Sequence, residues 1–319
     1  RFHMERDAIE RFGKFTDRAI VVVHQKDPAL GEALAGAGYP ELLDEQGLVR
    51  DGKAEGMIAA TLLVRLAGKK YVGFVDADNY FPGSVLEYVR AYSAGFALSG
   101  SPYSMVRIAW HSKPKIVESS LFFAKSGRVS ARTNQVLNEI IGHYTGFGTD
   151  VIKTGNAGEH AMSMELAMLM SYAPGFAIEP YHFLDLWEKF GGILPGPFPE
   201  VMRENVEIFQ IESRNPHLHE AKGGEHVESR GYESLRAAYH SAVCPRAIKE
   251  ELLHEMRRRN LLGEAEEPAP LVRYPPLRQV DLPRFRHLIQ GQPYAGLLRA
   301  NGWPARNDGL PRDRAASGL

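Results

Sequence analysis

The sequence predicts an α/β fold: a mixed, Rossmann-like β-sheet flanked by helices and followed by a helical, proline-rich C-terminal extension. Two short apolar runs, Ala19–Val23 and Tyr71–Val75, are typical of strands that are buried on both faces. Between them, Met57–Leu66 carries apolar residues at helical spacing. A strand, a helix and a second strand in this order predict a βαβ unit.

The rest of the chain continues this alternation up to about residue 224. A helix at Met4–Phe15 precedes the first run. The later predicted elements are, in order, a helix from Pro82 to Tyr92, strands at Ala97–Ser99 and Ser104–Trp110, helices at Thr133–Tyr144 and Met162–Tyr172, strands at Phe176–Glu179 and Val206–Glu212, and amphipathic helices at Tyr232–Tyr239 and Arg246–Asn260. We therefore expect one α/β domain over residues 1–224 and a helical extension with a tail over residues 225–319.

The composition indicates a globular protein whose ligands are held by local charge. The 319 residues include 38 lysines and arginines against 39 aspartates and glutamates, which gives a net charge of −1. Nucleic-acid-binding proteins normally carry a basic excess, so we expect no nucleic-acid partner. No apolar run approaches the roughly 20 residues that span a bilayer, and no signal peptide opens the chain. We therefore expect no membrane partner and a cytoplasmic location.

Two carboxylates directly after the second apolar run are the strongest functional signal. Asp76 and Asp78 are spaced i, i+2 at the carboxyl end of a predicted strand, where open α/β sheets bind ligands. A divalent cation that bridges to phosphate oxygens would relieve their mutual repulsion. We expect Mg²⁺ first, with Mn²⁺, Co²⁺ and Zn²⁺ as alternatives. The structural alternative is an Asx turn that ends the strand.

The residues that follow the motif exclude two other kinds of acidic site. A haloacid-dehalogenase-like phosphotransferase needs a small hydroxylated or β-branched residue where Tyr80 stands. An EF-hand loop needs glycine where Phe81 stands. What remains is the D-x-D of nucleotide-sugar glycosyltransferases, in which a bound metal neutralises the diphosphate leaving group.

Basic residues at the start of two predicted helices suit anionic groups. Lys53, within Gly52-Lys53-Ala54-Glu55-Gly56, offers a point charge for phosphate next to a helix N-terminus. Gly127, Arg128 and Ser130 lie in a segment rich in cations and hydroxyls, which suits a small phosphate or carboxylate. The alternatives are a flexible loop with a solvated lysine and an ordinary N-capped helix with basic residues facing solvent.

Histidines add a second candidate ligand set. His217 and His219 follow the strand predicted at Val206–Glu212, and either could complete a metal site begun by Asp78. A pair of surface histidines is the alternative. Glu159 and His160 stand in the glycine-bearing segment 154–160, which either lines a cleft or serves folding alone. Cys244 is the single cysteine, and it forms no internal disulfide and belongs to no nucleophile motif.

The combination of these motifs resembles a known family. The order Gly52–Gly56, Asp76–Asn79, Gly127–Ser130 and Asn215–Glu220 closely resembles that of mannosyl-3-phosphoglycerate synthases. These are retaining glycosyltransferases of the GT-A fold, related to glucosyl-3-phosphoglycerate synthases. The resemblance extends to about Cys244 and makes residues 1–224 the catalytic domain. It implies transfer of mannose from GDP-mannose to the 2-hydroxyl of 3-phosphoglycerate, which yields the phosphorylated precursor of the compatible solute mannosylglycerate.

The resemblance also implies roles for individual residues. Lys53, Asp76 and Asp78 bind the donor, the two aspartates are the expected catalytic residues, and Asp78 holds the metal. His217 is preferred to His219 as the second metal ligand because it matches the related family better. Gly127, Arg128 and Ser130 hold the phosphoglycerate, and we assign Glu159 and His160 to the same acceptor side. The family begins with a base-binding strand, which we expect upstream of Arg1.

Two alternative functions remain open at this stage. A glucosyl-3-phosphoglycerate synthase that uses a glucose nucleotide would share every motif, and a sugar-nucleotide-binding protein without catalysis would need only the binding residues. For the enzyme we expect front-face attack, because the sequence offers no carboxylate as the covalent nucleophile of a double displacement. The C-terminal third is the candidate for a lid or a homodimer contact.

Overall fold

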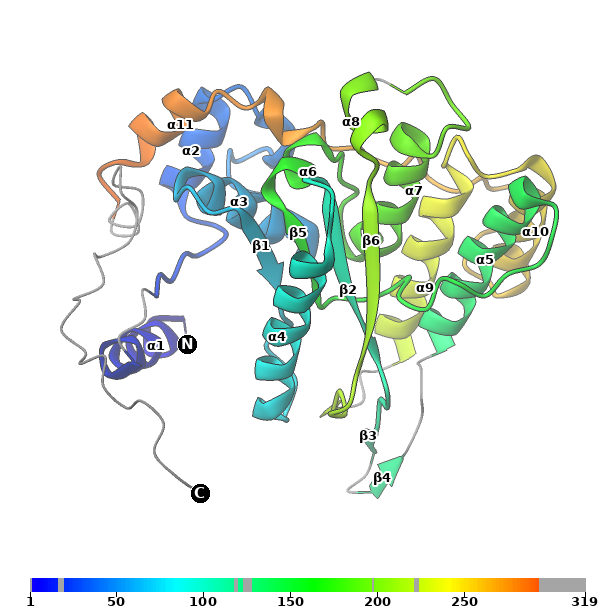
Figure 1. The fold of residues 1–319 in the computed structure, drawn as a ribbon, viewed down its shortest axis with the longest axis horizontal. Helices are drawn as coiled ribbons and strands as arrows, with labels where there is room; N and C mark the ends of the chain where they lie inside the picture. The colour runs from blue at the N-terminus through cyan, green and yellow to red at the C-terminus, as the bar shows by residue number, and fades with distance from the viewer. Residues whose placement is uncertain are drawn as a thin grey trace.

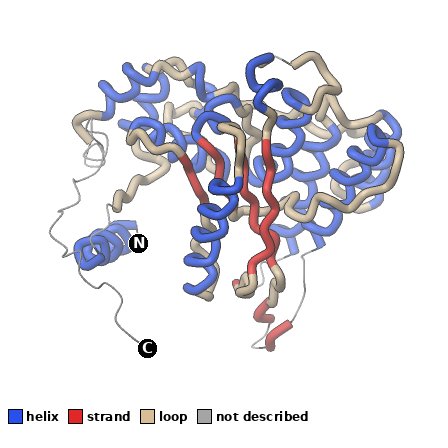
Figure 2. The backbone as a smooth tube through the Cα atoms, viewed as in Figure 1, coloured by secondary structure: helices blue, strands red, loops and turns tan. Residues whose placement is uncertain are grey.

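A four-stranded mixed sheet lies at the centre of the computed structural model (Figures 1 and 2). The structure describes residues 2–16, 20–117, 120–122, 128–196, 198–220 and 224–292. The strands are β1 (Tyr71–Phe74), β2 (Ser104–Trp110), β5 (His160–Ser163) and β6 (Glu207–Ser213), in the order β1-β5-β2-β6. β5 is antiparallel to β1 and β2, whereas β2 and β6 are parallel. The mixed α/β class is confirmed, and three of the predicted strands lie within two residues of their expected positions.

A smaller three-stranded sheet continues from the end of β2. It contains β3 (Lys115–Val117), β4 (Ser120–Phe122) and β7 (His219–Glu220), in the order β4-β3-β7. In Figure 1, β3 and β4 extend beyond the lower end of the central sheet.

Helices surround the central sheet. They are α1 (Phe2–Thr16), α2 (Pro28–Gly36), α3 (Lys53–Leu66), α4 (Pro82–Leu98), α5 (Arg128–Thr145), α6 (Met164–Leu169), α7 (Ile178–Phe190), α8 (Pro199–Glu204), α9 (Gly224–Tyr239), α10 (Arg246–Arg258) and α11 (Leu282–Ile289), with short 3₁₀ turns at Pro40–Leu42, Gly175–Ala177 and Leu277–Gln279. α4 packs on β2 and β6. α9 packs against α5, α7 and α10 around a second core that includes Leu137, Tyr181 and Leu252. None of the helices in the described part of the chain is long and apolar enough to cross a membrane.

The proline-rich C-terminal segment packs back onto the α/β domain. Tyr274 and Tyr172 exchange backbone hydrogen bonds of 2.8 and 3.1 Å. Further along, α11 packs on α2, where Phe285 and Leu34 are both fully buried. The domain boundary at residue 224 stays a prediction.

The first apolar run does not form the predicted strand. Residues 20–23 are irregular, and residues 17–19 lie outside the described part of the chain. Within the described residues β1 pairs with β5 only, so no neighbouring strand supplies hydrogen bonds to residues 20–23. The predicted βαβ unit is therefore wrong for this structure. The segment leads instead into α2, whose first turn is capped by the Asp27 side chain.

Three later predictions were also wrong. The Ala97–Ser99 strand is the end of α4 and the residue that caps it. The Met162–Tyr172 helix is shorter than expected, because residues 160–163 complete β5 and the Ser163 side chain then caps α6. Phe176–Glu179 forms a 3₁₀ turn and the start of α7, where Pro180 is tolerated because the first turn of a helix does not use its N–H groups.

Candidate functional site

The topology brings the predicted site residues to one edge of the central sheet. β1, β2 and β6 run in the same direction, and β5 runs against them. The residues that follow β1, β2 and β6 therefore meet the residues that precede β5 at this edge. They include Asp76 and Asp78 after β1, Lys113 after β2, His217 after β6 and Glu159 before β5. An edge of this kind is where open α/β sheets bind ligands.

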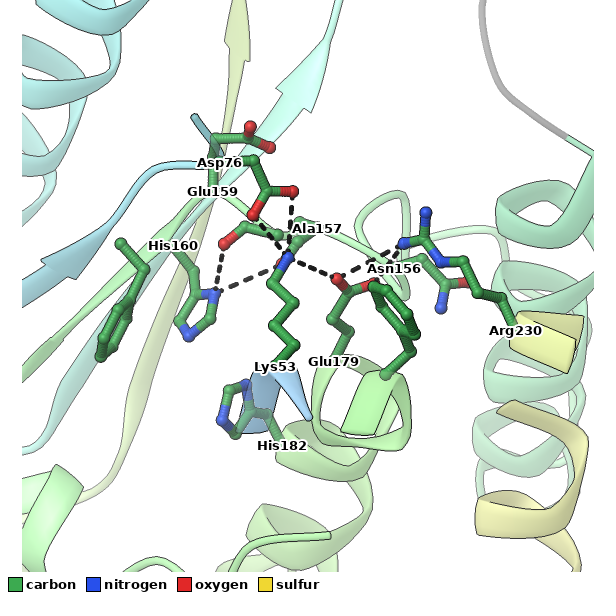
Figure 3. Close-up of polar contacts among 12 residues, drawn as sticks. Lys53, Asp76, Asn156, Ala157, Glu159, His160, Glu179, His182 and Arg230 are labelled. Carbon is green, nitrogen blue, oxygen red and sulfur yellow. Dashed lines mark hydrogen bonds and ion pairs between the residues drawn. The ribbon is translucent and has the colours of Figure 1, made fainter. Parts of the chain in front are cut away.

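Lys53 lies at the centre of an ion-pair network at this edge (Figure 3). Its Nζ atom is 2.7 Å from Asp76 Oδ1 and 2.9 Å from Glu179 Oε1. Burial disfavours the charge on Lys53, but Glu179 and Asp76 outweigh it and raise the pKa of the ammonium. The predicted basic residue is thus present at the site, and it is held between two carboxylates.

Two glycines near this network leave no room for a side chain. Gly52 precedes α3 with φ = 150°, a conformation that favours glycine, and a Cβ there would collide with the Glu55 carboxylate. A Cβ on Gly158 would collide with both Lys53 Nζ and Asp76 Oδ2. The loop that contains Gly158 therefore lies directly against the ion pair.

Glu179 is a site residue that the sequence analysis missed. It is fully buried at the start of α7, and its Oε2 atom lies 3.2 Å from Arg230 Nη2 of α9. Burial opposes its ionisation, but Lys53 and Arg230 lower the pKa of Glu179 to about 2. The guanidinium of Arg230 also stacks on the Phe176 ring, 4.4 Å from its centroid. The only sequence signal was a glutamate in an apolar run, which we interpreted as a strand end.

A second buried cation supports the walls of the site. Arg107 of β2 is fully buried and donates hydrogen bonds to the backbone oxygens of Thr154 and Glu179, at 2.7 and 2.9 Å. Its Nη1 atom lies 3.2 Å from His182 Nδ1. It thereby fixes both the loop that begins at Thr154 and the start of α7.

His160 is placed behind the wall of the site. Its ring is fully buried, and Nδ1 lies 3.0 Å from the Gly158 backbone oxygen and 3.3 Å from that of Ala157 (Figure 3). Burial, together with the charges of Arg107 and Lys53, lowers the pKa of His160 to about 3, so the ring is neutral. This geometry favours support of the loop over contact with the acceptor, which stays a prediction.

The D-x-D loop and the His217–His219 segment are bonded to one another. Tyr80 N donates to Leu218 O at 2.8 Å, and Leu218 N donates to Asn79 Oδ1 at 3.3 Å. Asn79 also forms the Asx turn that was the structural alternative for this motif, since its Oδ1 accepts a 3.0 Å hydrogen bond from Phe81 N. The structure therefore combines the turn with a direct connection between the D-x-D loop and the segment that carries the two histidines.

The possible metal ligands here fit a divalent cation whose remaining coordination positions are filled by substrate oxygens. Asp78 offers a carboxylate, and the rings of His217 and His219 lie 5.2 Å apart between centroids. In the described residues no group of three or more His, Cys, Asp and Glu side chains gathers tightly enough to hold a metal by itself. A site with two protein ligands would need phosphate oxygens or water for its remaining positions. The choice between the two histidines stays a prediction.

Glu159 and Lys113 form the inner side of the same region. Glu159 is fully buried, and its Oε1 atom lies 3.5 Å from His217 Nδ1. Lys113 is 8% exposed, and its Nζ atom lies 3.9 Å from the centroid of the Trp110 ring, which in turn lies 4.7 Å from the His217 ring. Burial raises the pKa of Glu159 and lowers that of Lys113, each to about 8. The assignment of Glu159 to the acceptor side stays a prediction, and Lys113 had no role predicted from the sequence.

The predicted acceptor segment is described only in part. Gly127 lies outside the described residues, and α5 begins at Arg128, so Ser130 stands in its first turn. A Cβ on Gly231 of α9 would lie 3.9 Å from Val129, which places this turn against α9 at the residue after Arg230. Arg132 is held by Glu255, with Nε 2.7 Å from Oε2, and therefore anchors the helix. The roles of Gly127, Arg128 and Ser130 stay predictions.

Comparison with known proteins places the chain in a family. The family model described as mannosyl-3-phosphoglycerate synthase matches residues 1–289. The chain belongs to the mannosyl-3-phosphoglycerate synthase family. Within it, the mannosyl-3-phosphoglycerate synthase of Pyrococcus furiosus is 44% identical over 291 residues, which cover 91% of this chain and 74% of that protein. The family member of the same name from Aeropyrum pernix is 38% identical over 277 residues, which cover 86% of this chain and 70% of that protein.

Two solved structures show more distant similarity. The mannosyl-3-phosphoglycerate synthase of Rubrobacter xylanophilus has a TM-score of 0.44 and 16% identity, with 79% of this chain and 71% of that chain covered. The glucosyl-3-phosphoglycerate synthase of Mycobacterium tuberculosis, solved with Mn²⁺, UDP-glucose and phosphoglyceric acid, has a TM-score of 0.43 and 16% identity, with 72% of this chain and 66% of that chain covered.

Proposed function

We propose that this protein transfers mannose from GDP-mannose to the 2-hydroxyl of 3-phosphoglycerate with retention at the anomeric carbon. The observation that carries the proposal is membership of the mannosyl-3-phosphoglycerate synthase family, with 44% identity to the Pyrococcus furiosus member. The reaction breaks the bond between the anomeric carbon and the diphosphate and forms a bond to the acceptor oxygen. GDP leaves, and the proton of the acceptor hydroxyl leaves with it.

The donor side of the site contains Lys53, Asp76 and Asp78. Lys53 is charged and fixed by two carboxylates, so it presents a stationary cation at the N-terminus of α3. Asp78 together with His217 or His219 would hold a divalent cation, of which Mg²⁺ is our first expectation. When bound, that cation neutralises the negative charge that develops on the diphosphate as it departs.

Arg230 and the first turn of α5 form the acceptor side. Arg230 joins the site through its ion pair with Glu179, and α5 packs against the helix that carries Arg230. The first turn of a helix has backbone N–H groups without partners inside the helix. A phosphorylated carboxylic acid carries two anionic groups, which suits a guanidinium next to a helix N-terminus. Gly127, Arg128 and Ser130 remain the expected contacts, joined now by Arg230.

Front-face attack remains the mechanism that these residues favour. Glu179 is paired with both Lys53 and Arg230, and a carboxylate so strongly stabilised is a weak nucleophile. Glu159 does not serve as the nucleophile in this proposal either, because it is fully buried beside His217. The acceptor hydroxyl would then attack from the side of the leaving diphosphate, and an oxygen of that diphosphate would accept its proton.

One assay separates this proposal from its alternatives. The full-length protein is incubated with 3-phosphoglycerate, Mg²⁺ and either GDP-mannose or a glucose nucleotide, and nucleotide release and product mass are measured. GDP release with a mannosyl-phosphoglycerate product is the expected result. Release with the glucose nucleotide alone would identify a glucosyl-3-phosphoglycerate synthase, and binding without release from any pair would identify a non-catalytic protein. Light scattering on the same sample tests the predicted homodimer.

A further inference from the structure

Lys113 is a buried cation at the site that no predicted role uses. Its side chain is 8% exposed, and its ammonium lies over the Trp110 ring at 3.9 Å. Within the described residues no hydrogen bond or ion pair to a carboxylate holds it. Lys53 and Arg230, by contrast, are each paired with a buried carboxylate. Lys113 can therefore take an incoming anion without breaking an existing ion pair.

The surroundings of Lys113 indicate which anion it would meet. The Trp110 ring beneath it packs 4.7 Å from the His217 ring. His217 Nδ1 lies 3.4 Å from Asn79 Nδ2, in the loop that carries Asp76 and Asp78. Lys113 thus stands on the side of the site where the D-x-D loop and His217 meet, while Arg230 and the start of α5 lie beyond Glu179.

We propose that Lys113 binds the terminal phosphate of the donor diphosphate and holds that phosphate as it departs. The proposal rests on the proposed function, since it takes a nucleoside diphosphate sugar as the donor. Lys53 and Lys113 would then contact the diphosphate from two different elements, the start of α3 and the end of β2.

The electrostatic environment of Lys113 agrees with this role. Burial lowers the pKa of Lys113, against the attraction of Glu159. A phosphate beside the ammonium would oppose that effect of burial and favour the charged form, because an opposite charge at hydrogen-bond distance stabilises it. The stacked Trp110 ring restricts the side chain without a competing carboxylate contact.

The test compares two nucleotides that differ only in the terminal phosphate. Dissociation constants of GDP and GMP are measured by calorimetry on the full-length protein at constant Mg²⁺, for the wild type, Lys113→Met and Lys113→Arg. We expect Lys113→Met to weaken the binding of GDP by about 10-fold to 100-fold and that of GMP by less than about 2-fold. The reason is that a hydrogen bond to a charged group is lost for GDP only. Lys113→Arg should recover most of the GDP affinity. Lys70→Met, at the exposed residue that precedes β1, is the matched control and should change neither constant.

The ratio of the two constants decides the outcome even if the variant is less stable, because GDP and GMP report on the same folded fraction. An unchanged ratio in Lys113→Met would overturn the proposal. If the KM for 3-phosphoglycerate rises while the ratio of the GDP and GMP constants is unchanged, Lys113 binds the acceptor, and the proposal is overturned as well. If the wild type binds UDP instead of GDP, the proposed donor is wrong, and the ratio for UDP and UMP still tests Lys113.

Discussion

Replacing Glu179 with glutamine tests the ion-pair network at the centre of the site. The carboxylate is fully buried and paired with Lys53 at 2.9 Å and Arg230 at 3.2 Å. Its pKa is about 2 in the folded protein, against an ordinary value of 4.5. That difference corresponds to about 3 kcal/mol of stability at pH 7. Glu179→Gln keeps the shape but leaves two cations without their shared counter-ion, so we expect a loss of about 3 kcal/mol.

The assay is urea unfolding at pH 7, followed by fluorescence. Glu250→Gln is the matched control, because Glu250 pairs with Arg246 on the surface, where 63% and 92% of the side chains are exposed. We expect that control to change the free energy of unfolding by less than about 0.5 kcal/mol. The double variant Lys53→Met/Glu179→Gln should be less destabilised than the sum of its single variants, by about 1–3 kcal/mol, because the two side chains are in direct contact.

The pH dependence of the same variant follows from the sign of the shift. Because the pKa of Glu179 is lower in the folded state, its ionisation stabilises the fold above pH 4.5, and this contribution is lost as the pH falls towards 2. The difference in the free energy of unfolding between the wild type and Glu179→Gln should therefore fall by more than half between pH 7 and about pH 3. A variant that unfolds within about 0.5 kcal/mol of the wild type at pH 7 would refute the reasoning.

Three further predictions concern the metal, the buried histidines and the acceptor helix. Asp78→Ala should lower kcat by at least about 100-fold and abolish stimulation by Mg²⁺, measured as GDP release across a metal titration. His160 is neutral when folded, with a pKa of about 3, so the unfolded state gains its proton as the pH falls below about 6.5. Urea unfolding should show that this histidine costs about 1 kcal/mol of stability between pH 7 and pH 5.5, and that His160→Gln reduces the loss. Arg132→Met should lower stability by about 1 kcal/mol, because Arg132 anchors α5 to Glu255, while the KM for 3-phosphoglycerate stays within about 2-fold.

Each of these has an outcome that contradicts it. Near-normal turnover of Asp78→Ala at all Mg²⁺ concentrations would show that Asp78 does not bind the metal. If the wild type and His160→Gln lose the same free energy of unfolding as the pH falls, the ring is not held neutral in the folded state. A large rise in KM for Arg132→Met at unchanged stability would show that Arg132 contacts the acceptor.

The central sheet was predictable where the chain supplies its own pattern. Ser104–Trp110 and Val206–Glu212 are segments of strand length that are rich in apolar residues, and both form strands next to one another. Ala19–Val23 has the same pattern, yet residues 20–23 are irregular, because a buried strand needs a neighbour and β1 pairs with β5 only within the described residues. The predicted Met162–Tyr172 helix took in the end of the short strand His160–Ser163, since a segment of four residues does not distinguish the helical period from the strand period.

By itself the sequence determined the chemistry of the ligands. Two aspartates after an apolar strand, a lysine at a helix start and a histidine pair indicate a cation and phosphates whatever their exact positions, because charge and donor type belong to the residue. Only the tertiary structure decided which groups meet. Glu179, Arg230 and Lys113 come from segments far apart in the chain, and their ionisation depends on burial and on neighbours that no local pattern contains.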